Sequence, residues 1–205
     1  MSVLTPYLKT LATQRWDDHR FYHQSRINQT LHLISACSFL VAYVLLFIDP
    51  AMAALVGWGV SMVTRQSGHF FFEPRGFDQL NQVTDEYKEE VKVGFNMRRK
   101  SVLLAVWAAI PLVLWMQPSL FGLIEPASGV SGWLHDVGMA WLALALAGIA
   151  FRVLQLSLQG RPLEGVIWVT KILTDPFHDI ALYWRSPLAL LRGEWVDPMA
   201  HVRPH

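Results

Sequence analysis

The chain has 205 residues, which is enough for one domain of ordinary size. Apolar residues make up 53% of it and charged residues only 16%, whereas a soluble domain carries about 25% charged residues. The 17 basic residues nearly balance the 16 acidic ones, and no basic patch interleaved with aromatic residues points to a nucleic-acid partner. A single cysteine, Cys37, rules out an internal disulfide.

The shortage of charge is concentrated in four apolar segments. We predict a membrane-crossing helix over each, because about 20 apolar helical residues match the thickness of the hydrocarbon core. The predicted spans are about 31–48, 51–68, 101–124 and 133–157, with Asp49-Pro50 as a tight turn between the first two. The alternative is a soluble bundle whose helices are wholly buried.

The basic residues decide between these alternatives. Residues 1–30 hold four Lys or Arg, residues 65–100 hold seven and residues 152–205 hold six, while the two intervening turns hold none. A four-span arrangement therefore places every basic residue on one side, which the positive-inside rule makes cytoplasmic. We predict an all-α, polytopic membrane protein: one membrane domain over residues 1–205, with four transmembrane helices and both termini in the cytoplasm, in a bacterial inner membrane or the endoplasmic reticulum.

Two segments outside the spans are predicted to lie at the cytoplasmic surface. Residues 77–100 are charged, and Asp85 and Lys88 have the spacing of an ion pair on a helix. The tail, residues 163–205, is apolar and aromatic but interrupted, which predicts interfacial helices rather than a fifth span. Asp175 before Pro176 predicts the N-cap and first position of a short helix. His178 would then lie in its first turn, with Asp179 available to orient an imidazole.

Histidines are predicted to gather at the cytoplasmic edge of the first hairpin. His32 lies 17 residues before Asp49, and His69 lies 19 residues after Pro50. At about 1.5 Å per residue both are roughly 26–29 Å from the turn, so an antiparallel hairpin brings them to the same depth. His23 precedes His32 by nine residues, half a turn away on an unbroken helix. It joins them if the helix bends near Ser25, or if the two side chains reach one site from different angles.

Imidazoles at this depth suit a bound metal, either iron or zinc, and ionisable groups at membrane depth are usually functional. The predicted ligands are His23, His32, His69 and His178. Glu73 is a carboxylate ligand, a group that orients an imidazole, or simply the ion-pair partner of Arg75. Whether His19, four residues before His23, joins the site is left open. The alternative is that these histidines are interfacial side chains with no metal.

Two sequence motifs flank the first predicted hairpin, and together they resemble the motifs of a known protein family. Tyr22, His23, Asn28 and His32 spell YHxxxxNxxxH, and residues 68–73 spell GHxxFE. Together they resemble the fungal and bacterial 2-hydroxy fatty acid dioxygenase family, small membrane proteins of fatty acid α-oxidation. The resemblance covers about the first 75 residues, with a weaker echo at 175–184. The family usually follows GHxxFE with a basic pair and Pro-Ala, whereas this chain reads PRGF.

The resemblance implies an iron(II)-dependent dioxygenase that shortens a 2-hydroxy fatty acid by one carbon, with molecular oxygen as second substrate and membrane lipid as surroundings. It implies catalytic roles for Tyr22, Asn28 and Glu73, and metal-binding roles for His23, His32 and His69. The acyl tail is expected between helices, among residues such as Phe70, Phe71 and Phe72. The alternatives are a non-enzymatic lipid-binding or scaffold protein, and a zinc-dependent lipid hydrolase with the same ligands.

Overall fold

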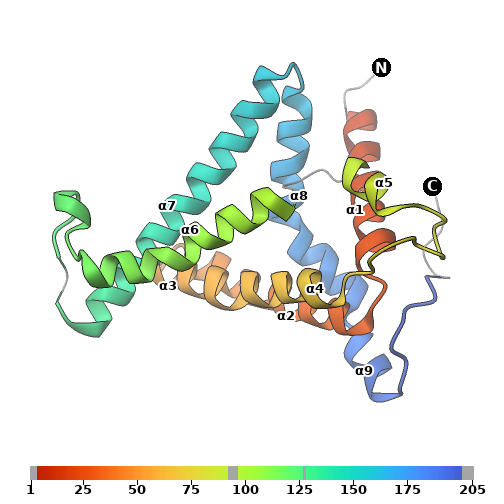
Figure 1. Cartoon of the computed structure of the whole chain (residues 1–205), viewed down its shortest axis with the longest axis horizontal. Coiled ribbons are helices and arrows are strands. Elements are labelled where there is room, and N and C mark those ends of the chain that lie inside the picture. Colours follow the sequence, from red (N-terminus) through yellow and green to blue (C-terminus); the bar gives the residue numbers. More distant parts are fainter. Residues whose placement is uncertain (1–3, 92–96, 127, 200–205) are drawn as a thin grey trace.

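The computed structural model describes residues 4–91, 97–126 and 128–199, and the regular elements in these ranges are all helices (Figure 1). The all-α class predicted from the sequence is confirmed. The last six residues of the predicted interfacial tail lie outside the described residues. The elements are α1 Leu4–Tyr22, α2 Arg26–Leu45, α3 Pro50–Val56, the π-helix η1 Gly57–Met62, α4 Val63–Phe72, α5 Asp85–Val91, α6 Met97–Met116, the short 3₁₀ helix η2 Leu120–Gly122, α7 Gly129–Leu158, α8 Pro162–Tyr183 and α9 Ser186–Leu191.

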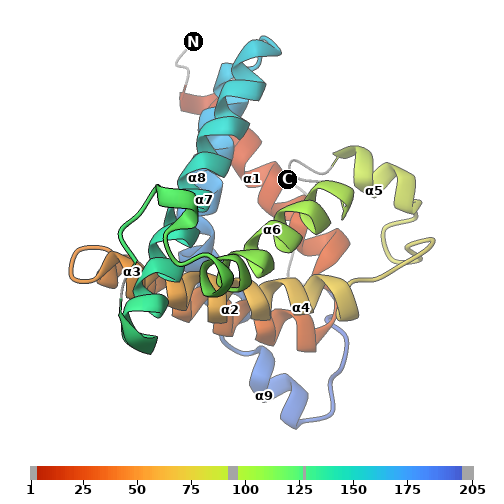
Figure 2. The same ribbon diagram turned by 60° about the vertical axis from the view of Figure 1, so that its left-hand side comes forward.

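The centre of the fold is an antiparallel hairpin. Its first arm is α2 and its second arm is the continuous helical segment α3–η1–α4, which lies beside α2 in both views (Figures 1 and 2). The predicted turn is confirmed: the Asp49 carboxylate accepts a hydrogen bond of 3.0 Å from the backbone N–H of Met52, and Pro50 occupies the first turn of α3. An Asp N-cap followed by proline is a strong local start signal for a helix.

A second hairpin, α7–α8, packs against the first. Gly138 lets α7 approach α3 closely, because a Cβ at this position would lie 2.4 Å from the carbonyl oxygen of Ala51. Three indoles join α6 and α7 to η1: Trp58 Nε1 donates to the Trp141 carbonyl at 3.1 Å, and Trp141 Nε1 donates to the Trp107 carbonyl at 2.9 Å. The indole N–H groups of Trp58 and Trp141 thus find backbone acceptors within the packed centre of the apolar helices.

The tail differs from its prediction. Asp175 and Pro176 do not begin a short helix: both are buried inside α8, which runs without interruption from Pro162 to Tyr183. The Asp175 carboxylate does not cap a helix but pairs with Arg15 of α1 at 3.1 Å and with Lys171 at 2.5 Å. Lys171 also pairs with Asp18 of α1. These ion pairs fasten α8 to α1 and place its C-terminal turns beside the break between α1 and α2.

Two helices, α2 and α7, are long and apolar enough to cross a membrane, and Ser101–Met116 of α6 forms a shorter apolar helix. By length and composition the described residues thus offer two candidate spans where the sequence predicted four. The third predicted span also ends earlier than expected, at Met116 rather than near residue 124. Large apolar side chains such as Leu112, Trp115, Leu146 and Phe151 are exposed on α6 and α7, which is typical of surfaces that meet lipid or a partner.

Candidate metal centre

The site begins at a break between two helices, where the backbone leaves the helical conformation. Helix α1 ends at Tyr22 and α2 starts at Arg26, with the Ser25 side chain capping the backbone N–H of Asn28 at 3.5 Å. This break is the bend near Ser25 that would let His23 join His32. The cap residue has an extended backbone, so the residues before it are freed from the helical period of α2.

Side chains from α2 hold the end of α1 in place. Asn28 Nδ2 donates to the carbonyl of Tyr22 at 2.7 Å, and Gln29 Nε2 donates to the carbonyl of His23 at 2.8 Å. These carbonyls belong to the last residue of α1 and to the residue that follows it, where a helix end leaves acceptors without partners of its own. The Asn28 of the first motif therefore has a structural role at the break.

The chain segment after α9 returns to the same break. The backbone N–H of Arg26 donates to the Trp195 carbonyl at 3.0 Å, and that of Asp197 donates to the Gln24 carbonyl at 2.8 Å. The buried Asp197 carboxylate accepts from Gln29 at 2.8 Å and pairs with Arg26 at 2.9 Å. Residues far apart in the sequence thus fix the conformation from which the His23 ring projects.

Three histidine rings converge beside this break. The ring centroids of His23 and His32 are 4.0 Å apart, those of His32 and His69 are 4.9 Å apart, and those of His23 and His69 are 5.3 Å apart. One ligand nitrogen from each ring lies within 4.8 Å of the others, and the group could hold a metal ion. Imidazole–metal bonds of about 2.0–2.1 Å need shifts of only ~1 Å per ring to close on one ion.

Each of the three rings has an oxygen atom in contact with its Nδ1 nitrogen. The Nδ1 atoms of His23, His32 and His69 contact Tyr183 Oη at 2.8 Å, Asp179 Oδ2 at 3.4 Å and Glu73 Oε2 at 3.0 Å, respectively. Nε2 is therefore the candidate ligand atom of each ring. Among the described residues, the buried His23 Nε2 has no hydrogen-bond partner. A ring whose second nitrogen is held by a carboxylate or another oxygen is the usual state of a metal-ligating histidine.

The hydrogen-bond directions around Tyr183 follow from this arrangement. If His23 binds a metal through Nε2, its Nδ1 carries the proton and donates to the Tyr183 oxygen. The Tyr183 hydroxyl then donates its own proton to His19 Nδ1, 3.0 Å away. His19 is thus placed outside the group of three but connected to it through Tyr183. On the other side, Asp179 Oδ2 also pairs with Arg65 at 3.1 Å.

The electrostatic surroundings favour the neutral form of His23. Burial, followed by the nearby His32 and His69, lowers the pKa of His23 well below its ordinary value of 6.5. Burial also raises the pKa of Tyr183 well above 10, with further contributions from Asp179 and Asp18. A neutral imidazole is the form that binds metal, and a protonated phenol remains a hydrogen-bond donor. Both shifts therefore support the donor set described above.

The glycine of the second motif sets the distance between the two arms of the hairpin. A Cβ at Gly68 would lie 2.1 Å from Asn28 Oδ1 and 3.4 Å from His32 Cδ2. Any larger residue would push α4 away from α2 and carry His69 with it. The Gly-His pair thus combines close helix contact with a ligand on the next residue.

The remaining predicted site residues are placed as follows. Glu73 contacts His69, while Arg75 donates to the Phe70 carbonyl, so Glu73 is in the position of a group that orients an imidazole. The Tyr22 hydroxyl donates to the Lys88 carbonyl of α5 at 2.5 Å. His178 is half-buried on α8 and does not belong to the group of three. Its neighbour Asp179 reaches His32 instead.

Tyr183 is the site residue that the sequence analysis missed. It is fully buried, and its hydroxyl joins two histidines. The sequence does contain one indication of its role, since Asp179 and Tyr183 are four residues apart and such residues lie on the same face of a helix. That indication is useful only once α8 is known to be continuous. Comparisons with protein-family models, curated proteins and solved structures found no match, so the assignment depends on the geometry of the site itself.

Proposed function

We propose that this protein is an iron(II)-dependent membrane dioxygenase that shortens a 2-hydroxy fatty acid by one carbon. The observation that carries the proposal is the convergence of His23, His32 and His69, each with an oxygen contacting its Nδ1. The substrate class is supported by the resemblance of the two histidine motifs to the 2-hydroxy fatty acid dioxygenase family, since the same residues form the group of three.

The donor set suits this chemistry. His23, His32 and His69 would hold iron(II) through imidazole nitrogens, and the bound metal would supply oxygen activation next to a 2-hydroxy acid. The overall reaction balances without an outside reductant: RCH(OH)COOH + O₂ gives RCOOH + CO₂ + H₂O. The C1–C2 bond breaks, C2 becomes the new carboxyl carbon, C1 leaves as carbon dioxide, and oxygen takes up the four electrons. Tyr183, Asp179 and Glu73 keep the rings in the tautomer and orientation that binding requires.

The proposal includes the four-span topology with both termini in the cytoplasm. The supporting observations are the segregation of the basic residues along the chain, the apolar length of α2 and α7, and the exposed apolar side chains of α6 and α7. In this topology the three histidines lie at the cytoplasmic edge of the bilayer. A fatty acid's carboxylate then meets the site at the water boundary while its tail remains in an apolar environment.

The test is metal analysis and turnover of protein purified without oxygen. We expect about one iron per chain, and equal amounts of oxygen consumed and carbon dioxide released from 2-hydroxypalmitate, with a product one carbon shorter. His69→Gln should abolish both, and His135→Gln should change neither, because His135 is exposed on α7. Zinc with oxygen-independent ester hydrolysis would establish the hydrolase alternative. A folded protein that takes up no transition metal would leave the lipid-binding alternative.

A further inference from the structure

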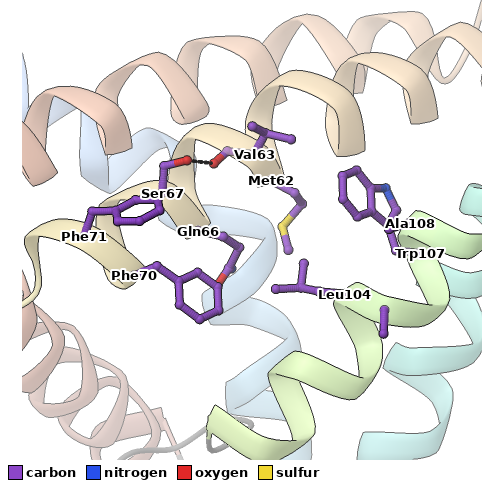
Figure 3. Close-up of a pocket in the computed structure, with 10 residues that line it drawn as sticks. Met62, Val63, Gln66, Ser67, Phe70, Phe71, Leu104, Trp107 and Ala108 are labelled. Atoms are coloured by element: carbon purple, nitrogen blue, oxygen red, sulfur yellow. Dashed lines mark hydrogen bonds between the residues drawn. The ribbon is translucent and has the colours of Figure 1, made fainter.

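An apolar pocket of about 390 Å³ lies between the second arm of the hairpin and α6 (Figure 3). Figure 3 shows Leu104 of α6 pointing across the space toward Met62 and Gln66. Its size is that of a small-molecule site, since such pockets measure roughly 300–1,000 Å³. Its lining includes Met62, Gln66 and Phe70 on one side and Leu104, Ala105 and Ala108 on the other.

The pocket begins within one helical turn of His69, one of the three converging histidines. Gln66 lines it and precedes His69 by three residues on α4, a spacing that makes two side chains neighbours on a helix surface. Phe70, the residue after His69, forms part of the same wall. The pocket therefore lies beside the His69 end of the three-histidine group, about one helical turn away along α4.

Gln66 and Ser67 are the polar residues of a mainly apolar lining, and the Ser67 hydroxyl already donates to the Val63 carbonyl, so Gln66 is the one considered for a ligand. Its Oε1 is buried and has no hydrogen-bond partner among the residues described. A buried acceptor without a partner is costly, and a hydroxyl group on a bound molecule would satisfy it. Opposite the aromatic ring of Phe70, α6 presents the small side chains of Ala105 and Ala108, which leave room for a narrow, flexible chain.

We infer, on the basis of the proposed function, that this pocket holds the alkyl chain of the 2-hydroxy acid. Gln66 accepts a hydrogen bond from the 2-hydroxyl group, and Ala108 with Leu104 sets the length of chain that fits. Each methylene buried contributes about 0.8 kcal/mol, equivalent to roughly fourfold in affinity. Binding should therefore tighten about fourfold per added methylene until the pocket is full and then stop changing.

The experiment measures binding rather than turnover. Purified full-length protein in detergent, loaded with metal and kept without oxygen, is titrated with 2-hydroxy acids of increasing chain length against a fluorescent fatty acid. Ala108→Trp fills the pocket, and we expect the plateau to move to a shorter chain with the metal content unchanged. Ala109→Trp is the matched control, because Ala109 is exposed on α6 and does not line the pocket. It should behave as the wild type.

Two further variants test the inference independently of Ala108→Trp, in case that variant fails to fold. Leu104→Ala enlarges the pocket and should move the plateau to longer chains. Gln66→Leu should weaken binding of the 2-hydroxy acid about tenfold while leaving the unsubstituted acid unaffected, since only the former has a hydroxyl to donate. A chain-length dependence identical in wild type, Ala108→Trp and Leu104→Ala would overturn the inference and indicate that bulk lipid fills the pocket.

The outcomes separate this inference from the proposed function. If the acids bind with the expected chain-length dependence but are never shortened, the dioxygenase proposal fails and the pocket assignment stands. If the acids are shortened but the product profile is the same in Ala108→Trp as in Ala109→Trp, the pocket assignment fails and the dioxygenase proposal stands.

Discussion

The backbone of Gly68 lies directly against the side-chain amide of Asn28, so closely that a Cβ on the glycine would be 2.1 Å from Asn28 Oδ1. Each of the two sequence motifs contributes one of these residues. Asn28 holds the last turn of α1 through the Tyr22 carbonyl, and Gly68 precedes the ligand His69. The contact therefore fixes both the bend that releases His23 and the separation of α2 from α4.

We predict that Gly68→Ala weakens metal binding at least tenfold, because the added methyl group forces α4 away from Asn28 and displaces His69 from the other rings. Titration of the metal-free protein with Co(II) or Zn(II) measures the change. Gly148→Ala is the control, since a Cβ there meets nothing within 4 Å. In a helix interior this exchange should stabilise the protein by about 0.5–1 kcal/mol. Equal metal affinity in the two variants would contradict the role given to Gly68.

Substitutions distinguish the three proposed ligands from His178, the fourth histidine that the sequence predicted as a ligand. His23→Gln, His32→Gln and His69→Gln should each remove stoichiometric metal, since each takes one nitrogen from the group. His178→Gln should retain it, because the structure leaves His178 outside the group. Metal content per chain, measured on variants with wild-type helical circular dichroism, decides the matter. Loss of metal in His178→Gln would restore the tail histidine as a ligand.

The third prediction tests Tyr183 as a positioning residue. Tyr183→Phe removes the oxygen that contacts His23 Nδ1 and should lower metal affinity about 10- to 100-fold, the usual effect of losing a group that orients a ligand. His19→Gln acts through Tyr183 and should have a smaller effect in the same direction. Tyr43→Phe is the control, because the Tyr43 hydroxyl donates to the Leu173 carbonyl instead. The ligand-field spectrum of bound Co(II) should change in Tyr183→Phe but not in Tyr43→Phe, which a general loss of stability would not produce.

The fourth prediction concerns the pH dependence of stability in the metal-free protein. Burial lowers the pKa of His23 well below 6.5 in the folded state, while the unfolded chain has the ordinary value near 6.5. Below about pH 6.5 the unfolded state therefore binds more protons than the folded state, so stability decreases as the pH falls toward the folded pKa. Thermal unfolding followed between neutral and acidic pH should show this decrease. His23→Gln should make it shallower, and an unchanged slope would show that His23 is not responsible.

Much of the fold follows from features local in the sequence. The apolar runs predict the helices because their lengths and lack of charge leave few other conformations, and Asp49-Pro50 predicts the turn because its capping requires only the next three residues. Given that turn, the constant rise of a helix fixes His32 and His69 at the same depth. The pairing of these two histidines was therefore predictable before any tertiary contact was known.

Only the tertiary structure decides the rest of the site. The break that turns His23 toward His32 is held by Trp195 and Asp197, about 170 residues away along the chain, and no local pattern contains that information. The local pattern at Asp175-Pro176 predicts a helix start, but ion pairs of Asp175 with Arg15 and Lys171 favour a continuous α8. That continuity places Asp179 and Tyr183 behind the histidines. The sequence alone determined that the His32 and His69 rings share a depth. Long-range polar contacts determined how the rings are oriented, because a side chain's hydrogen-bond partners depend on which helices meet and not on which residues are adjacent in the sequence.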